Sequence, residues 1–304
     1  MPGASVADYL SVEELAQFPE LELRARFLVE GCLNGLHQSP FQGCNVEFKE
    51  HREYSHGDEF RNIDWNVYAR TDRLYMRLRE DETNLSAVLL LDRSASMDFQ
   101  GTRAKISKYA FAQACAAALM LFLRRQGDAF TLGLVGNRMP ELDAPSASEV
   151  QFQRMLAELS VPADSGDCRW EMTLPHLARI LKSHSIAVLF SDFYTEPETL
   201  APLLDFIRRR NCEILLFHVF DPDERDLFAD DSVLLQDAES LEKMIVTPEL
   251  LREDYQNLFR SHQTALSELA AKFGGEYAPL CTERPPLELL AAWLRRREKA
   301  GWRR

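Results

Sequence analysis

Residues 87–92 read AVLLLD, five apolar residues closed by an acid. A strand that is covered on both faces has this composition, because its side chains meet a hydrophobic layer whichever way they point. Beyond it, helical periodicity predicts helices at 105–125 and 148–160, with an apolar strand at 130–135 between them. Gly127, just past the first helix, is a typical helix stop signal. This alternation of strands and helices is typical of a parallel α/β sheet.

The same alternation continues toward the end of the chain, without an internal repeat or a low-complexity linker. Further helices are predicted at 173–183, 198–210, 248–273 and 286–299, and further strands at 186–190, 213–220, 232–236, 243–246 and 276–280. We therefore predict that residues 86–304 form an α/β domain with a doubly wound, mostly parallel sheet of the Rossmann-like type.

Residues 1–85 have a different pattern. A helix is predicted at 12–35 and a polar, helix-like segment at 60–70. The extended runs 47–54 and 74–84 are expected to pair with each other, because a lone strand leaves its backbone groups unbonded. The segment is too small for a core of its own, so we predict a small α+β extension that docks on the sheet.

Composition limits the functions that this chain can have. Of its 304 residues, 46% are hydrophobic and 27% charged, as in a globular protein, and the formal net charge is −13. General binding to nucleic acid or to anionic membranes needs clustered basic residues, so the acidic balance argues against both. The longest apolar stretch, 109–123, is shorter than the roughly 20 residues of a bilayer span. Six cysteines without a C-x-x-C pair, and no signal peptide at the N-terminus, predict a cytoplasmic protein without a membrane anchor.

Oxygen-bearing side chains follow the predicted strands. Asp92, Ser94 and Ser96 come directly after the first buried strand, Thr173 opens a helix, and Asp192 follows another strand. The carboxyl ends of parallel strands meet at one edge of the sheet, so these residues can converge. Two carboxylates and three hydroxyls are hard donors, which favour Mg²⁺, with Mn²⁺ or Ca²⁺ as alternatives. An incoming carboxylate of a partner protein could complete the coordination shell.

Two motifs resemble known families. The D-x-S-x-S segment, the later Thr173 and the later Asp192 resemble the metal-ion-dependent adhesion site of von Willebrand factor A domains. The string R-x-Y-x-x-G-D-x-x-R-x-I-D-W, from Arg52 to Trp65, is similar to the hallmark of the bacterial family called domain of unknown function 58. The resemblance covers about residues 41–241 and is far more specific than D-x-S-x-S alone.

This resemblance implies a von Willebrand factor A-like protein without enzymatic activity. It also implies work beside a MoxR-type AAA+ ATPase, in a chaperone-like or complex-maturation role. The chain departs from the pattern at the threonine, since such domains usually have glycines just before it and this chain has Cys168 to Met172 there. Ser165 is therefore an alternative to Thr173 as a ligand.

Other interpretations remain open for the same residues. Asp92, Ser94 and Ser96 are types that also form turns and cap helices, which would leave a scaffold with a vestigial metal site. Asp92 could instead be the nucleophile of an aspartyl-phosphate hydrolase. Such enzymes usually have a second acid two residues on, where this chain has Ser94, and no partner lysine is recognisable. Outside the set, Asp98 is expected to be solvated and His218 to be a satisfied core histidine.

Overall fold

The computed structural model describes residues 51–53, 70, 73, 75–77, 85–137, 142–164, 166–227, 233–236 and 243–284. They belong to two units, one holding the described residues from 85 onward and the other those from 51 to 77. The helices predicted at 12–35 and 286–299, and nearly all of the segment at 60–70, lie outside these ranges.

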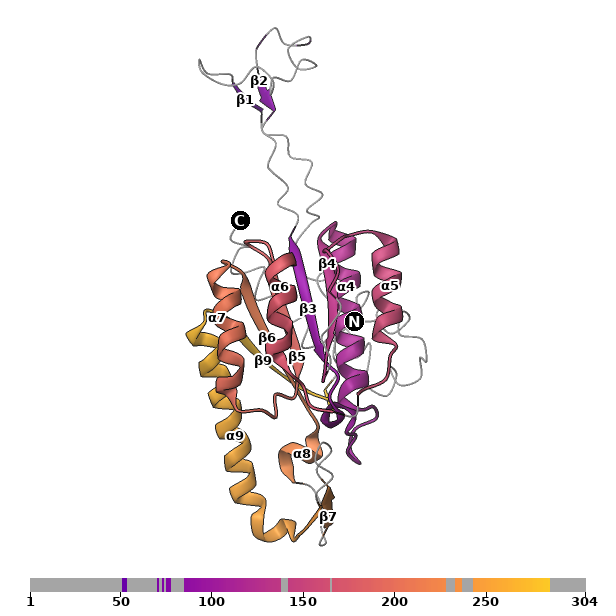
Figure 1. The fold of residues 1–304 in the computed structure, drawn as a ribbon, viewed down its shortest axis with the longest axis vertical. Helices are drawn as coiled ribbons and strands as arrows, with labels where there is room; N and C mark the ends of the chain where they lie inside the picture. The colour runs from indigo at the N-terminus through magenta and orange to yellow at the C-terminus, as the bar shows by residue number, and fades with distance from the viewer. Residues whose placement is uncertain are drawn as a thin grey trace, which may run out of the picture. The chain divides into compact units, whose positions relative to one another are not determined.

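The larger unit contains a five-stranded sheet in which every pair of neighbours is parallel (Figure 1). The strand order is β4-β3-β5-β6-β9. The chain therefore runs from β3 to β4 at one edge of the sheet, and then crosses to the other side of β3 to form β5, β6 and β9 in turn. This sheet confirms the predicted α/β fold and its parallel strands. The strands are β3 (Ser86–Asp92), β4 (Ala129–Val135), β5 (Ile186–Ser191), β6 (Glu213–Phe220) and β9 (Glu276–Cys281).

The helices lie close to their predicted positions, with differences at their ends. The helix predicted at 173–183 ends earlier, at Ile180, because Leu181 is extended, and the one predicted at 198–210 opens with a 3-10 turn. Gly127 ends α4 in the left-handed conformation, with φ 80°. The α-helices are α4 (Lys108–Gln126), α5 (Glu149–Leu159), α6 (Leu174–Ile180), α7 (Ala201–Arg209), α8 (Pro222–Asp226) and α9 (Pro248–Lys272). The 3-10 helices are η3 (Ala95–Asp98), η4 (Trp170–Thr173) and η5 (Pro197–Leu200).

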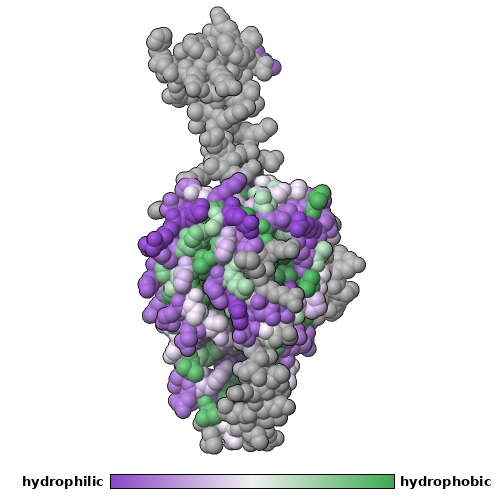
Figure 2. Space-filling view, in the orientation of Figure 1, coloured by the Kyte–Doolittle hydropathy of each residue, from purple (hydrophilic) through white to green (hydrophobic). Residues whose placement is uncertain are grey.

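Alternate residues of β3 enter different hydrophobic layers. Leu89 and Leu91 pack in the layer that contains α4 and α5, whereas Val88 and Leu90 pack in the layer of α6, α7 and α9 (Figure 1). Strand side chains alternate in direction, so a strand covered by helices on both sides must be apolar throughout. The face in Figure 2 mixes hydrophilic and hydrophobic residues over the described surface. None of the helices within the described ranges is both long and apolar enough to cross a bilayer.

Two small antiparallel sheets complete the described structure. In the larger unit β7 (Val233–Gln236) pairs with β8 (Lys243–Val246), as their predicted strand character suggested. In the other unit β1 (His51–Glu53) pairs with β2 (Tyr75–Arg77), which confirms that the two predicted extended runs pair. Docking of this N-terminal segment on the sheet stays a prediction.

Candidate functional site

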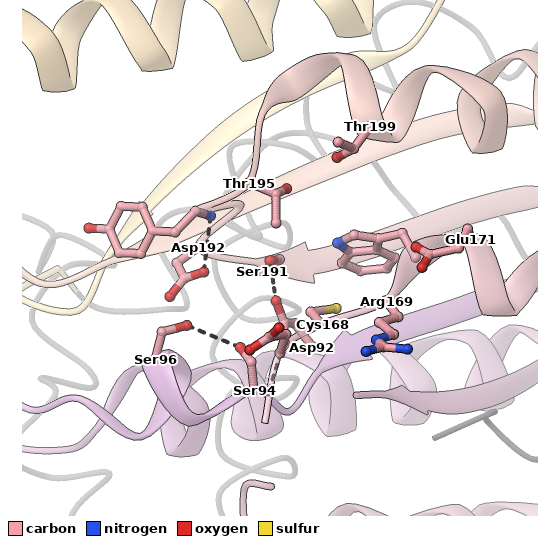
Figure 3. Close-up of a pocket in the computed structure, with 13 residues that line it drawn as sticks. Asp92, Ser94, Ser96, Cys168, Arg169, Glu171, Ser191, Asp192, Thr195 and Thr199 are labelled. Atoms are coloured by element: carbon pink, nitrogen blue, oxygen red, sulfur yellow. Dashed lines mark hydrogen bonds between the residues drawn. The ribbon is translucent and has the colours of Figure 1, made fainter. Parts of the chain in front are cut away.

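A pocket of about 210 Å³ lies at the carboxyl ends of β3 and β5 (Figure 3). These strands are neighbours, with Leu91 opposite Phe190, so the residues that follow on each strand also lie side by side. Asp92, Ser94, Ser96 and Asp192 all line the pocket. The structure therefore brings together four of the five residues predicted from the sequence. Its volume is below the roughly 300 Å³ at which small-molecule sites begin, and suits an ion and one side chain.

The D-x-S-x-S segment folds back on its own aspartate. The backbone N–H of Ser94 donates to Asp92 Oδ1 over 2.8 Å, and the 3-10 turn η3 then places Ser96 beside Ser94. Their hydroxyl oxygens lie 3.1 Å apart (Figure 3). This local turn brings the two hydroxyls together next to the aspartate that Ser94 caps.

Asp92 is a buried carboxylate close to a second one. Its side chain receives a further hydrogen bond from the hydroxyl of Ser191, the last residue of β5. Burial, and then the charge of Asp192, raise the pKa of Asp92 to about 6, although the hydrogen bonds from Ser191 and Ser94 oppose this rise. The pocket therefore has a negative potential that a bound cation would relieve.

These donors fit a small hard cation. Neighbouring ligands of an octahedral Mg²⁺ at about 2.1 Å lie about 3 Å apart, close to the distance between the Ser94 and Ser96 oxygens. No group of three or more His, Cys, Asp or Glu in the part of the chain that the structure describes could hold a metal. A cation at this pocket would thus depend on the serine hydroxyls as well as on Asp92 and Asp192.

Thr173 does not join the other four residues. It is buried at the end of η4, and its hydroxyl donates to the carbonyl of Trp170 over 2.7 Å instead of lining the pocket. It precedes α6 as predicted, but its side chain does not cap that helix. The alternative ligand, Ser165, lies outside the described residues.

The sequence interpretation missed a lysine beside the pocket. Lys108, in the first turn of α4, is fully buried, and its Nζ lies 2.8 Å from Asp192 Oδ2 and 2.6 Å from Glu224 Oε1. Burial alone would lower the pKa of Lys108, but the two carboxylates outweigh it and raise the pKa. The signal was a charged residue directly before the apolar stretch 109–123, which by itself suggests only a solvated helix end.

Asp98 and His218, which were predicted to lie outside the site, are found in the solvated and core environments expected of them. Asp98 is exposed, as expected. His218 is buried in β6, with Nδ1 2.7 Å from the Tyr277 hydroxyl, while Nε2 has no hydrogen-bond partner in the described structure. Burial lowers the pKa of His218 to about 3, so the ring is neutral near pH 7. It is a core histidine, but only one of its two nitrogens is satisfied.

Solved structures with some likeness to this chain share little sequence with it. An aerotolerance-related membrane protein of Bacteroides fragilis has a TM-score of 0.49 at 11% identity, covering 71% of this chain and 100% of that one. BatB of Bacteroides thetaiotaomicron has a TM-score of 0.46 at 10% identity, covering 71% and 99%. The SpRpn10 VWA domain has a TM-score of 0.41 at 11% identity, covering 68% and 93%. The α/β fold class follows from the parallel strand order and from the helical layers on both faces of the sheet.

Sequence relatives give a firmer result. An uncharacterized protein of Mycobacterium tuberculosis, Rv1480, is 31% identical over 277 residues, which cover 89% of this chain and 84% of that protein. The uncharacterized protein Mb1516 of Mycobacterium bovis has the same identity and coverage. The family described as "Protein of unknown function DUF58" matches residues 50–265, and this match includes the D-x-S-x-S segment, Lys108 and Asp192. The chain belongs to the DUF58 family.

Proposed function

We propose that this chain is a protein-interaction module, which binds a carboxylate of a partner through a divalent cation held in the pocket. One observation carries the proposal: Asp92, Ser94, Ser96 and Asp192 line a single small pocket and offer it only oxygen donors. Mg²⁺ is the expected ion, with Mn²⁺ or Ca²⁺ as alternatives, because such donors suit hard cations. When bound, the cation would supply a positive charge with open coordination positions.

The geometry leaves room for a ligand. Mg²⁺ takes six oxygens, and four protein residues leave positions for water or for a partner's carboxylate. Two other lining groups, Trp170 Nε1 and Thr195 Oγ1, are buried and have no hydrogen-bond partner within the described ranges. Buried donors without a partner are rare, and a local movement that opens either one to the pocket would offer a donor for a ligand's second carboxylate oxygen. Tyr194, also at the pocket and 44% exposed, offers the aromatic surface common in protein interfaces.

The partner that we propose is a MoxR-type AAA+ ATPase, with the chain acting in a chaperone-like or complex-maturation role in the cytoplasm. This part of the proposal rests on the family resemblance of the sequence and on the acidic side chain that the pocket would accept. An exposed Asp or Glu of the ATPase would supply the carboxylate.

Pull-down of the candidate ATPase by the full chain tests the proposal. Binding should be lost in EDTA, return with excess Mg²⁺, and be lost in Asp92→Asn. Asp98→Asn is the matched control, because it makes the same chemical change at an exposed aspartate nearby and should leave binding intact. Binding that is indifferent to both EDTA and Asp92→Asn would reject a metal-dependent contact.

The structure offers less support for the phosphatase alternative. The residue two positions after Asp92 is Ser94, where such enzymes usually have a second acid. A lysine is present nearby, but Lys108 does not line the pocket, and its ammonium is held by two carboxylates. We therefore expect no metal-dependent turnover of generic phosphate esters. Steady hydrolysis that disappears in Asp92→Asn would favour the enzyme instead.

A vestigial site is the other alternative, and direct metal binding separates it from the proposal. Isothermal titration of the full chain with Mg²⁺ and Mn²⁺ should give a heat of binding that Asp92→Asn abolishes. No heat with either metal would leave a scaffold without a working cation site.

A further inference from the structure

A buried ammonium lies directly behind the proposed cation site. The side chain of Lys108 is 0% exposed, and its two hydrogen-bonded partners are Asp192, at the pocket, and Glu224, on α8. Asp192 therefore presents one oxygen, Oδ2, to an internal cation before any metal binds. Its other oxygen, Oδ1, accepts the backbone N–H of Tyr194 over 3.3 Å.

Aromatic rings cover this ammonium on the solvent side. Nζ of Lys108 lies 4.7 Å from the ring centroid of Tyr194 and 5.8 Å from that of Phe99, within the range of cation–π attraction. Both rings are partly exposed, while the lysine beneath them is not. Leaving this place would break two charged hydrogen bonds and both ring contacts, so Lys108 is a fixed part of the site.

The charges of this cluster suggest what the lysine does. The cluster of Asp92, Asp192, Glu224 and Lys108 has a formal charge of −2, from three carboxylates and one ammonium. The other charged residues that line the pocket, Asp167, Arg169 and Glu171, add a further −1 outside this cluster. One divalent cation would make the cluster neutral. Without the lysine, the same cation would leave a charge of −1, which attracts metal more strongly and repels an incoming carboxylate. Without Glu224, the metal-bound cluster would carry +1, with the opposite effects.

We propose that Lys108 is a resident counter-ion that weakens the pocket's affinity for divalent cations and keeps a bound cation receptive to a partner's carboxylate, with Glu224 acting in the opposite direction. The inference rests on the proposed function of the same pocket. Lys108 is a positioning residue, since it acts through Asp192 and does not line the pocket itself.

Calorimetric titration of the full chain with Mg²⁺ and with Mn²⁺ tests the inference. Lys108→Met keeps the side chain's size and removes its charge, and should tighten metal binding about tenfold or more, because charges a few ångströms apart in a protein interact strongly. Glu224→Gln should weaken metal binding by a similar factor. Lys105→Met removes the same charge at an exposed position three residues earlier, and should change the affinity less than about twofold.

The opposite signs separate this role from a merely structural one, because two damaging substitutions would both weaken binding. Glu224→Gln is also the safer variant for folding. It keeps the Lys108–Asp192 pair, and its amide oxygen can still accept the backbone N–H of Asp221. Lys108→Met leaves two carboxylates without their buried cation and should unfold at a lower temperature in EDTA. Thermal unfolding followed by circular dichroism should show that Mg²⁺ raises the unfolding temperature of Lys108→Met by more than it raises that of the wild type.

The outcomes distinguish this inference from the proposed function. Equal metal affinity in wild type, Lys108→Met and Glu224→Gln would overturn the role of Lys108 and leave the cation site intact. No heat in any of the three proteins would overturn both. Heat in Lys108→Met but not in wild type would support the counter-ion role and reject a cation site in the native chain. If Lys108→Met does not fold in any condition, Glu224→Gln decides, and unchanged or tighter binding there would overturn the inference.

Discussion

Replacing Asp92 by Asn should stabilise the metal-free protein at neutral pH, although it removes a residue of the proposed site. The reason is the pKa of Asp92, which burial and then Asp192 raise from 3.8 to about 6 in the folded chain. Each pKa unit corresponds to about 1.4 kcal/mol, so ionised Asp92 costs the folded state about 3 kcal/mol at pH 8. An uncharged Asn avoids that cost.

The size of this effect changes with pH in a defined window. Between about pH 4 and pH 6 the folded chain keeps a proton on Asp92 that the unfolded chain has lost, so the unfolding free energy falls as pH rises. Asn does not titrate. The advantage of Asp92→Asn over the wild type should therefore grow by about 2–3 kcal/mol from pH 4 to pH 8.

Urea denaturation in EDTA at both pH values measures this difference. Asn can still accept the backbone N–H of Ser94. A weakened hydrogen bond to Ser191 would cost about 1 kcal/mol at either pH, so it largely cancels when the unfolding free energies at the two pH values are compared. Asp98→Asn is the control and should change the unfolding free energy by less than about 0.5 kcal/mol. Saturating Mg²⁺ should reverse the order, because it stabilises only the wild type. A difference between Asp92→Asn and wild type that is the same at pH 4 and pH 8 would refute the reasoning.

Three further substitutions test the fold around the pocket by urea or thermal denaturation. Ser107→Ala should cost about 1 kcal/mol, since the Ser107 hydroxyl caps α4 by accepting the N–H of Ala110. Gly101→Ala should cost about 1–3 kcal/mol, because a Cβ would lie within 3 Å of the Asp221 and Asp223 carboxylates that hold this turn. A stability equal to wild type would contradict either expectation. His218→Leu should flatten the dependence of the unfolding free energy on pH. The folded pKa of His218, about 3, lies below its ordinary value of 6.5. The folded wild type therefore becomes less stable by about 3 kcal/mol as pH falls from 7.5 to 4.5, and the Leu variant lacks this loss. An unchanged slope in His218→Leu would count against a buried neutral ring.

Local patterns in the sequence were sufficient for the elements of the α/β unit. The AVLLLD run became β3, and Gly127 ended α4, because strand burial and helix ends depend on residues near each other in the chain. The strand ends also indicated that Asp92 and Asp192 would meet, since parallel order places carboxyl ends at one edge.

Contacts between distant segments decided the rest of the site. Thr173 matches a motif position, but the 3-10 turn before it directs its hydroxyl to the Trp170 carbonyl. Lys108 lies 84 residues before Asp192 and 116 before Glu224, and no local pattern pairs a lysine with acids so far away. Its charge matters because burial removes the water that would otherwise screen it. That burial comes from residues distant in the chain, namely Asp192 after β5, Tyr194 and Glu224 on α8.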